Sequence, residues 1–212
     1  MLDFGFYNRD CMEGMKEFPD NYFDLAIVDP PYGIGASGKT YGKRIIKHEK
    51  KNWDSEPPPP SYFKELFRVS EKQIIFGGNY FSLPLTGGWI FWDKDKGKET
   101  TFSDGELAWT NFLNTLKKVA IRYDGFIGMD EGGRLHPTQK PVKLYEWLLS
   151  KYAKPGYKIL DTHVGSASSL IACHRGGFDY VGFELDKDYY NMANKRLETE
   201  KSQTSIFDFI ER

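Results

Sequence analysis

The sequence has few cysteines and no long apolar run, and both absences narrow the class of protein. The two cysteines, Cys11 and Cys173, are too few and too far apart for a disulfide framework. No apolar run approaches the roughly 20 residues of a membrane-spanning helix. The opening MLDFGFYNRD lacks the basic and then apolar pattern of a signal peptide. We therefore expect a single-domain protein of the reducing cytoplasm that does not enter a membrane.

The chain as a whole has almost no excess of charge of either sign, but one segment is strongly basic. The formal net charge is −1, yet residues 33–52 hold six basic residues and one acid, Glu49. A solvated loop is the usual explanation of such a run. Because this one directly follows a candidate active site, we interpret it as a surface for phosphates. The basic residues are Lys39, Lys43, Arg44, Lys47, Lys50 and Lys51.

Apolar periodicity predicts alternating strands and helices. The strands are expected at 4–8, 23–28, 73–78, 89–92, 106–112, 117–123, 157–161 and 180–184. The helices are expected at 11–18, 61–69, 142–152, 166–177 and 186–201. This alternation indicates an α/β fold whose mostly parallel sheet carries helices on both faces. We expect one domain over 1–212, with a basic insertion at 33–60 and an apolar tail at 202–212.

The stretch DPPYGIG (29–35) leaves the buried strand FDLAIV through an acid, two prolines and a tyrosine. A turn needs one proline at most, so the stretch indicates a carboxylate and a backbone carbonyl held in place beside an aromatic ring. A purely structural turn is the alternative. Gly33 and Gly35 then let the chain swing into the basic segment.

A second candidate site combines a strand, a turn and a helix start in ILDTHVGSASS (159–169). Asp161 ends the strand and Gly165 lies in the turn, where helix amides face a bound polar group. Glu184 ends the next strand, in YVGFELD, where an acid can accept hydrogen bonds from ribose hydroxyls. Alone, Glu184 could simply be a charge at a helix start. Together the two segments favour a nucleoside cofactor.

These segments together resemble the amino-group DNA methyltransferases that use S-adenosylmethionine. DPPY (29–32) is similar to their catalytic motif, DTHVGSASS (161–169) to their cofactor motif, and HPTQKP (136–141) to the segment that precedes it in the permuted beta class. The resemblance covers nearly the whole chain. It implies a Rossmann-like methyltransferase fold with a seven-stranded sheet and circularly permuted motif order. The strand at 4–8 should then pair beside the strand at 180–184.

The resemblance also implies the cofactor site. Lys140 is expected to face the carboxylate of S-adenosylmethionine, and Glu184 its ribose. Thr162, His163 and Ala167 depart from the family pattern. We expect His163 to pack as a neutral ring, and Ala167 to need no positive φ. The implied cofactor-binding residues are Asp10, Cys11, Asp29, His136, Thr138, Gln139, Lys140, Asp161, His163, Gly165, Ser166, Ser168, Glu184 and Leu185. No Cys/His cluster has metal-ligand spacing, so no metal is expected.

The catalytic residues implied by the resemblance are Asp29, Pro30, Pro31 and Tyr32. The Asp29 carboxylate and the Pro30 carbonyl would accept the two hydrogens of an exocyclic amino group, and Tyr32 would stack on the flipped base. Asp at position 29 favours the 6-amino group of adenine, with the 4-amino group of cytosine as the alternative. An RNA base, a protein glutamine amide and a non-catalytic DNA-binding relic are further alternatives.

The expected partner is double-stranded DNA, in a bacterial or phage restriction-modification setting. Few segments remain for DNA contact, so a homodimer could extend that surface. The tail holds QTSIF, Gln203 to Phe207, which resembles the short peptides that grip the bacterial replication sliding clamp. The alternative is a tail that folds back over a groove of its own domain or covers a dimer edge.

The basic segment generates the first testable prediction. Replacing Lys43, Arg44, Lys47, Lys50 and Lys51 together by glutamine should weaken DNA binding and flatten its salt dependence, because fewer counterions are released. Titrations of labelled duplex at several salt concentrations measure the slope of log affinity against log salt. An unchanged slope would show that other residues meet the phosphates.

Overall fold

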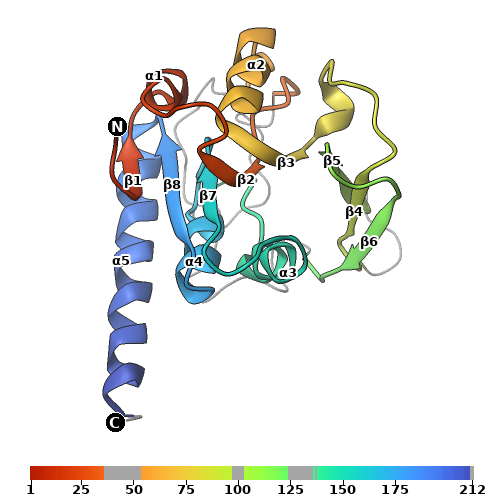
Figure 1. Ribbon diagram of the computed structural model, residues 1–212. Coiled ribbons are helices and arrows are strands. Elements are labelled where there is room, and N and C mark those ends of the chain that lie inside the picture. Colours follow the sequence, from red (N-terminus) through yellow and green to blue (C-terminus); the bar gives the residue numbers. More distant parts are fainter. Residues whose placement is uncertain (36–53, 97–102, 124–135, 137, 211–212) are drawn as a thin grey trace.

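The computed structural model describes residues 1–35, 54–96, 103–123, 136 and 138–210, with side chains through residue 203 (Figure 1). The strands are β1 (Gly5–Asn8), β2 (Phe23–Val28), β3 (Ser70–Phe76), β4 (Trp89–Asp93), β5 (Gly105–Thr110), β6 (Lys117–Ala120), β7 (Lys158–Asp161) and β8 (Asp179–Glu184). The helices are α1 (Cys11–Met15), α2 (Pro60–Val69), α3 (Val142–Tyr152), α4 (Ser168–Arg175) and α5 (Lys187–Ile210), with a 3₁₀ turn η2 at Gly78–Tyr80.

All the strands of the described residues join one sheet in the order β1-β8-β7-β2-β3-β5-β4-β6. The first five are mutually parallel, and β5 runs antiparallel to both β3 and β4. Strand β1 pairs with β8, with Gly5 opposite Val181 and Asn8 opposite Glu184. The predicted pairing of these two distant segments is therefore confirmed.

The seven-stranded sheet implied by the family resemblance is wrong, because the sheet has eight strands, the number expected from periodicity. The outermost strand is β6, which pairs in parallel with β4 and places Val119 opposite Trp92. Both side chains are buried in the same cluster, and the indole Nε1 of Trp92 donates to the Ile121 carbonyl at 3.0 Å. Val119 is the one buried residue of β6, so its packing against Trp92 is what anchors this short edge strand.

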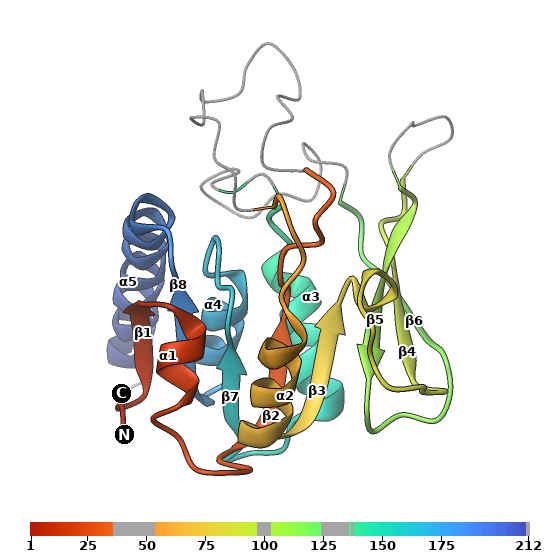
Figure 2. The same cartoon turned by 90° about the horizontal axis from the view of Figure 1, so that it is seen from above.

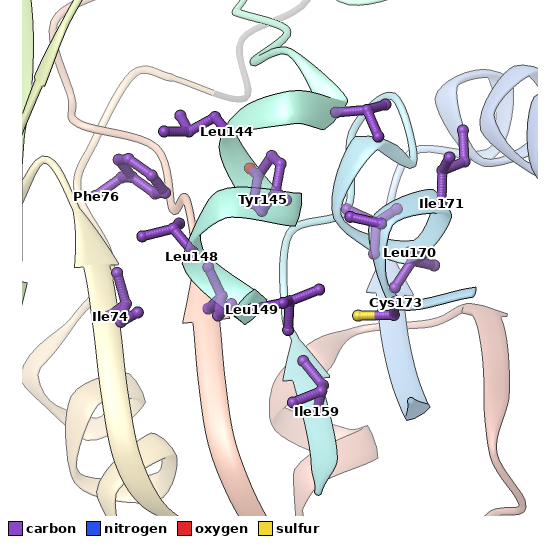
Figure 3. Close-up of a cluster of buried hydrophobic side chains, with 14 of the residues drawn as sticks. Ile74, Phe76, Leu144, Tyr145, Leu148, Leu149, Ile159, Leu170, Ile171 and Cys173 are labelled. Atoms are coloured by element: carbon purple, nitrogen blue, oxygen red, sulfur yellow. The ribbon is translucent and has the colours of Figure 1, made fainter. Parts of the chain in front are cut away.

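The central strands divide their side chains between two cores, as period-two alternation requires. On β2, Leu25 and Ile27 face one cluster with α3 and α4, whereas Ala26 and Val28 face the other with α1 and α2. Figure 3 shows the first cluster, in which Leu148 of α3 lies beside strand residues of β3. Helices therefore cover both faces, as the sequence predicts.

Helix α5 is longer than expected, since it runs to Ile210 instead of ending near Lys201. The sequence predicts an end near Lys201, because polar residues are followed by apolar ones there. That change does not stop a helix, and no glycine or proline occurs from Lys187 to Ile210 to break it. The backbone of 203–207 is therefore helical, and side chains beyond Gln203 lie outside the described part of the chain.

The turn before α4 corrects a second expectation. Ala167 has φ +66°, in the left-handed region, and is fully buried. We expected no positive φ at this position. The conformation is one that glycine adopts without strain and alanine adopts at a cost of about 1–2 kcal/mol. Burial of the Ala167 methyl group offsets part of that cost.

The α3 core generates a stability prediction. Leu148→Ala should lower the free energy of unfolding by about 2–5 kcal/mol, because Leu148 is fully buried and its removal leaves a cavity. The control is Leu116→Ala, where the leucine is 62% exposed. Urea titrations of both variants measure the difference. Equal stability of the two would contradict the packing described for α3.

Candidate active site

The carboxyl ends of five parallel strands meet at one edge of the sheet, where ligands bind in folds of this kind. Figure 2 shows the arrows of β1, β8, β7 and β3 pointing to this edge. Asp10 follows β1, Glu184 and Asp161 end β8 and β7, and Asp29 follows β2. The two segments singled out in the sequence therefore lie along the same edge.

The turn after β2 is fixed by residues that sequence reasoning did not select. Asp54, which is 1% exposed, accepts a hydrogen bond from the Gly33 amide at 2.9 Å. Its backbone carbonyl accepts another from Gly35 at 3.1 Å. Gly33 has φ +73°, and a Cβ there would lie 2.6 Å from Pro57 Cδ. These contacts fix the path of the chain directly after DPPY.

Asp29 lies in a buried group of four charged side chains and one tyrosine. The Lys140 ammonium contacts Asp29 Oδ2 at 2.6 Å and Glu106 Oε2 at 2.8 Å. Lys94 pairs with Glu106 Oε1 at 2.5 Å, and the Tyr32 hydroxyl donates to Asp29 Oδ1 at 2.6 Å. The side chains of Lys140 and Asp29 are only 3% and 16% exposed. We call these five residues the Asp29 cluster.

Burial and charge act in opposite directions on the carboxyl groups of the Asp29 cluster. Burial raises the pKa of Asp29, against the lowering effect of the Lys140 ammonium. Burial also acts to raise the pKa of Glu106, but the ammonium groups of Lys140 and Lys94 hold that pKa at about 2. Glu106 is thus a permanent anion at neutral pH, and it anchors Lys140.

The ring of Tyr32 packs on the turn that follows β3. It stacks on Tyr80 with ring centroids 5.1 Å apart and planes 13° apart. A Cβ on Gly77, which has φ +66°, would lie 2.2 Å from the Tyr32 ring, so only glycine fits below it. The predicted stacking of Tyr32 on a base stays a prediction. The structure shows a ring oriented by Gly77, Tyr80 and Asp29.

Glu184 joins the end of β8 to the turn after β7. Its Oε2 accepts the Gly165 amide at 2.9 Å, and its Oε1 accepts the Asp186 amide at 2.9 Å. Burial raises the pKa of this carboxyl group, which remains partly exposed. Leu185, next to it, is 69% exposed. The predicted contacts of Glu184 and Leu185 with a cofactor stay predictions.

Asp10 and Cys11 lie beside Glu184, since β1 pairs with β8. We call Asp10, Cys11, Gly165, Glu184 and Leu185 the nucleoside edge, after the ligand that the sequence predicts there. Asp10 caps α1, and its Oδ1 accepts the amides of Met12 and Glu13 at 2.8 and 3.2 Å. Burial raises the pKa of the Cys11 thiol to about 12. Cys11 is therefore a neutral thiol, and its predicted contact with the cofactor stays a prediction.

Asp161 is 3% exposed and receives hydrogen bonds from the His163 amide at 3.0 Å and from the Ser169 hydroxyl. Burial raises its pKa to about 7. Burial lowers the pKa of His163 to about 4, so its ring is neutral, in line with the sequence expectation. The ring meets Tyr62 edge-on at 5.4 Å, and the Tyr62 hydroxyl contacts Thr162 Oγ1 at 2.6 Å.

Ser166 and Ser168, both expected at the cofactor, are buried against α5. Their hydroxyls lie 3.1 Å apart. The Arg196 guanidinium donates to the Ser166 carbonyl at 2.8 Å and to Ser168 Oγ at 3.1 Å. The structure thus gives these serines a structural partner, and their contact with a cofactor stays a prediction.

His136, from the HPTQKP segment, lies beside the turn that holds Gly165. A Cβ added to Gly165 would lie 3.6 Å from the His136 ring. This ring meets Tyr189 of α5 edge-on at 4.5 Å, and its Nδ1 lies 3.1 Å from Thr138 Oγ1. The Gln139 amide donates to the His136 carbonyl at 3.1 Å. The segment thereby connects the nucleoside edge to Lys140, which the sequence placed at the cofactor and the structure pairs with Asp29.

The predicted DNA-contact residues Lys39, Lys43, Arg44, Lys47, Lys50 and Lys51 lie outside the described residues. Within the described part of the chain, His, Cys, Asp and Glu side chains form no group of three or more that could hold a metal ion. Over the same residues, no helix has the length and apolar character needed to span a membrane.

The fold is that of an α/β protein whose polar side chains gather at the carboxyl ends of its parallel strands. Comparison with known families gives the particular one, since the DNA methylase family for N6 and N4 amino groups matches residues 78–195. That match covers more than half of the 212 residues. The chain therefore belongs to the family of DNA methylases that modify exocyclic amino groups.

Individual relatives agree with this family. YubD of Escherichia coli strain K12 is 27% identical over 215 residues, 91% of this chain and 89% of that protein. The type II methyltransferase M.HpaI of Haemophilus parainfluenzae is 24% identical over 234 residues, 90% of this chain and 73% of that protein. Both similarities run through nearly the whole chain.

Solved structures share the fold. The complex of M1.HpyAVI with SAM aligns with a TM-score of 0.59 at 20% identity, covering 90% of this chain and 98% of that one. The cytosine-N4-specific PvuII DNA methyltransferase aligns with a TM-score of 0.61 at 13% identity, covering 95% and 91%. The methyltransferase fold expected from the sequence is thus present, with eight strands in place of seven.

Sequence reasoning missed Glu106, Lys94 and Asp54. Glu106 opens a predicted strand, but only the antiparallel direction of β5 brings that start to the edge where β3 ends. Lys94 follows β4, which pairs with β5, so it reaches Glu106 from the neighbouring strand. The available signal was an acid placed at the start of an otherwise apolar strand.

Asp161 generates a pH prediction. Its pKa of about 7 lies above the ordinary value of 3.8, so the folded state holds the proton more tightly than the unfolded state. This contribution to stability is full below pH 3.8 and is lost as pH rises through about 7. Asp161→Asn should therefore gain stability relative to the native chain between pH 5 and pH 8.

Urea unfolding at the two pH values measures this change. Asp179→Asn is the control, because Asp179 is exposed at the opposite end of β8. A stability difference between Asp161→Asn and the native chain that does not vary with pH would contradict the assignment.

Proposed function

We propose that this DNA methylase transfers a methyl group from S-adenosylmethionine to the 6-amino group of an adenine flipped out of duplex DNA. The observation that carries the proposal is the Asp29 carboxylate, buried and oriented by Tyr32 and Lys140 at the carboxyl edge of the sheet. An oriented buried acceptor is what an exocyclic amino group needs before it can react.

In this proposal Asp29 and Pro30 activate the amino group of the target base for methyl transfer. The lone pair of an exocyclic amino nitrogen is delocalised into the ring, which makes it a weak nucleophile. Acceptors on both of its hydrogens, the Asp29 carboxylate and the Pro30 carbonyl, favour the tetrahedral nitrogen that can form a bond to carbon. As that bond forms, the nitrogen gives up one proton along its hydrogen bond to Asp29. Pro30 and Pro31 restrict the backbone, so the two acceptors keep their spacing.

The nucleoside edge supports S-adenosylmethionine as the cofactor. In this proposal Glu184 accepts hydrogen bonds from the ribose hydroxyls and Leu185 contacts the adenine, with Asp10, Cys11, Gly165 and His163 as further contacts. When bound, the cofactor supplies the activated methyl group. M1.HpyAVI, whose chain shares this fold, forms a complex with SAM. Thr138, Gln139, Asp161, Ser166 and Ser168 complete the proposed binding set.

Methylation of the 4-amino group of cytosine is the second candidate. Cytosine offers the same two hydrogens to Asp29 and Pro30. One specific observation favours it, namely the fold shared with the cytosine-N4-specific PvuII enzyme. Asp at position 29 is the reason we place adenine first.

The proposed partner is double-stranded DNA, met through the basic segment, in a bacterial restriction-modification system. The type II methyltransferase M.HpaI supports that setting. A homodimer and a sliding-clamp contact through Gln203–Phe207 remain proposals. Because α5 is helical through these residues, a clamp contact would need the helix to unwind or a helical mode of binding.

The test is incorporation of labelled methyl groups into DNA, followed by identification of the methylated nucleoside by mass spectrometry. Asp29→Ala should lower the rate by about a hundredfold or more, since an oriented acceptor is lost. The control is Asp179→Ala, at an exposed carboxylate on the opposite edge. N6-methyladenine is the expected product, N4-methylcytosine would select the second candidate, and native activity of Asp29→Ala would refute the catalytic role.

A further inference from the structure

Lys140 brings a buried ammonium into direct contact with the carboxylate at the centre of the proposed reaction. Its Nζ lies 2.6 Å from Asp29 Oδ2 and 2.8 Å from Glu106 Oε2, and its side chain is 3% exposed. A buried ion pair is weak support for stability, because the desolvation of both charges offsets their attraction. A buried charge with a specific charged partner is instead a candidate for binding or chemistry.

The neighbouring atoms of the target base call for such a pair. In adenine the 6-amino group and ring nitrogen N1 are attached to the same carbon, and in cytosine the 4-amino group and N3 are. The amino group donates hydrogen bonds and the ring nitrogen accepts one. A protein acceptor next to a protein donor is the complement of these two base groups, just as an Asn or Gln amide complements N6 and N7 on the other edge of adenine. Asp29 Oδ2 and Lys140 Nζ, in direct contact, are such an acceptor and donor.

Both groups have hydrogen-bonding capacity left. A carboxylate offers about four lone-pair positions. Asp29 accepts from Tyr32 on Oδ1 and from Lys140 on Oδ2, so a base amino group can be added. The ammonium has three donors. Two are directed at Asp29 and Glu106, while the next contact, to the Tyr32 hydroxyl, is longer at 3.3 Å. That third donor can turn to a ring nitrogen without breaking either ion pair.

We propose that Lys140 donates a hydrogen bond to the ring nitrogen next to the target amino group, and that Glu106 positions its ammonium to do so. The inference rests on the proposed function and adds a residue that reads the base. It explains selection of bases whose Watson–Crick edge places an unprotonated ring nitrogen next to the amino group. Guanine presented through that edge would be rejected, because its amino group there adjoins N1–H, which points a donor at the Lys140 donor.

This assignment places Lys140 at the base rather than at the cofactor carboxylate. Glu106 is a positioning residue, since it reaches the base only through Lys140. Lys94 in turn holds the other oxygen of Glu106 at 2.5 Å. The chain Lys94–Glu106–Lys140–Asp29 thus connects β4 and β5 to the end of β2.

The experiment replaces one atom of the target. Oligonucleotides carrying the sequence found to be methylated are prepared with adenine or 1-deazaadenine at the target position, the latter having C–H in place of N1. If the product is N4-methylcytosine, cytosine and 3-deazacytosine are used. For the native chain, kcat/KM should favour the natural base by about tenfold to a hundredfold, the range for a hydrogen bond to a charged group. A native ratio near one would overturn the inference.

Variants then identify the donor. Lys140→Met should lower kcat/KM for the natural base and bring the ratio down by about tenfold. Lys151→Met, at an exposed lysine of α3, should leave the ratio unchanged. Glu106→Gln should lower the ratio of kcat/KM for the natural base to that for the deaza base, but by less than Lys140→Met does, because the ammonium loses only one of its two ion pairs. If Lys140→Met is poorly folded, Lys140→Met combined with Glu106→Gln removes the ammonium without leaving both carboxylates unpaired.

Calorimetry of cofactor binding separates the two roles of Lys140. The dissociation constant of S-adenosylmethionine should change less than twofold in Lys140→Met. A weaker affinity for the cofactor together with an unchanged base ratio would overturn the inference and assign Lys140 to the cofactor. Absence of methyl transfer to any DNA by the native chain would instead refute the proposed function, and this inference with it.

Discussion

The contact between Lys140 and Asp29 is the interaction on which the rest of the site depends. It joins a loop before α3 to the end of β2, which are 111 residues apart in the sequence. Neither charge could remain buried alone, since removing one partner of such a pair typically costs several kcal/mol. The β4–β5 pair completes the balance by bringing Lys94 and Glu106. In the candidate active site, each charge is thus balanced by the other members of a four-charge unit.

Two glycines allow the backbone to pass close to Tyr32 and to the turn that follows Asp29. Gly77 lies directly below the Tyr32 ring, and Gly33 lies against Pro57. Both have positive φ, so their conformation and the space around them impose the same residue. The aromatic ring and the carboxylate are therefore oriented before any ligand arrives, which lowers the entropy lost on binding.

Much of this arrangement could be predicted from the sequence, and the failures have definable causes. The strands and helices, and the edge that gathers Asp29, Asp161 and Glu184, follow from local patterns and parallel topology. The pairing of β1 with β8 follows from the resemblance to the permuted methyltransferases. Glu106 and Lys94 were not predicted as site residues, because their position depends on the direction of β5, which no local pattern encodes. The positive φ of Ala167 escaped because alanine normally avoids it.

The pairing of β1 with β8 has a consequence for the order of events during synthesis. Asp10 leaves the ribosome early, whereas Glu184, which completes the same nucleoside edge, emerges more than 170 residues later. The DPPY turn and most of the sheet can form in between, but the nucleoside edge cannot. Long-range parallel pairing is also slow to form. A nascent chain would therefore carry DPPY well before the proposed cofactor site is complete, so binding of the proposed methyl donor would report completion of the sheet.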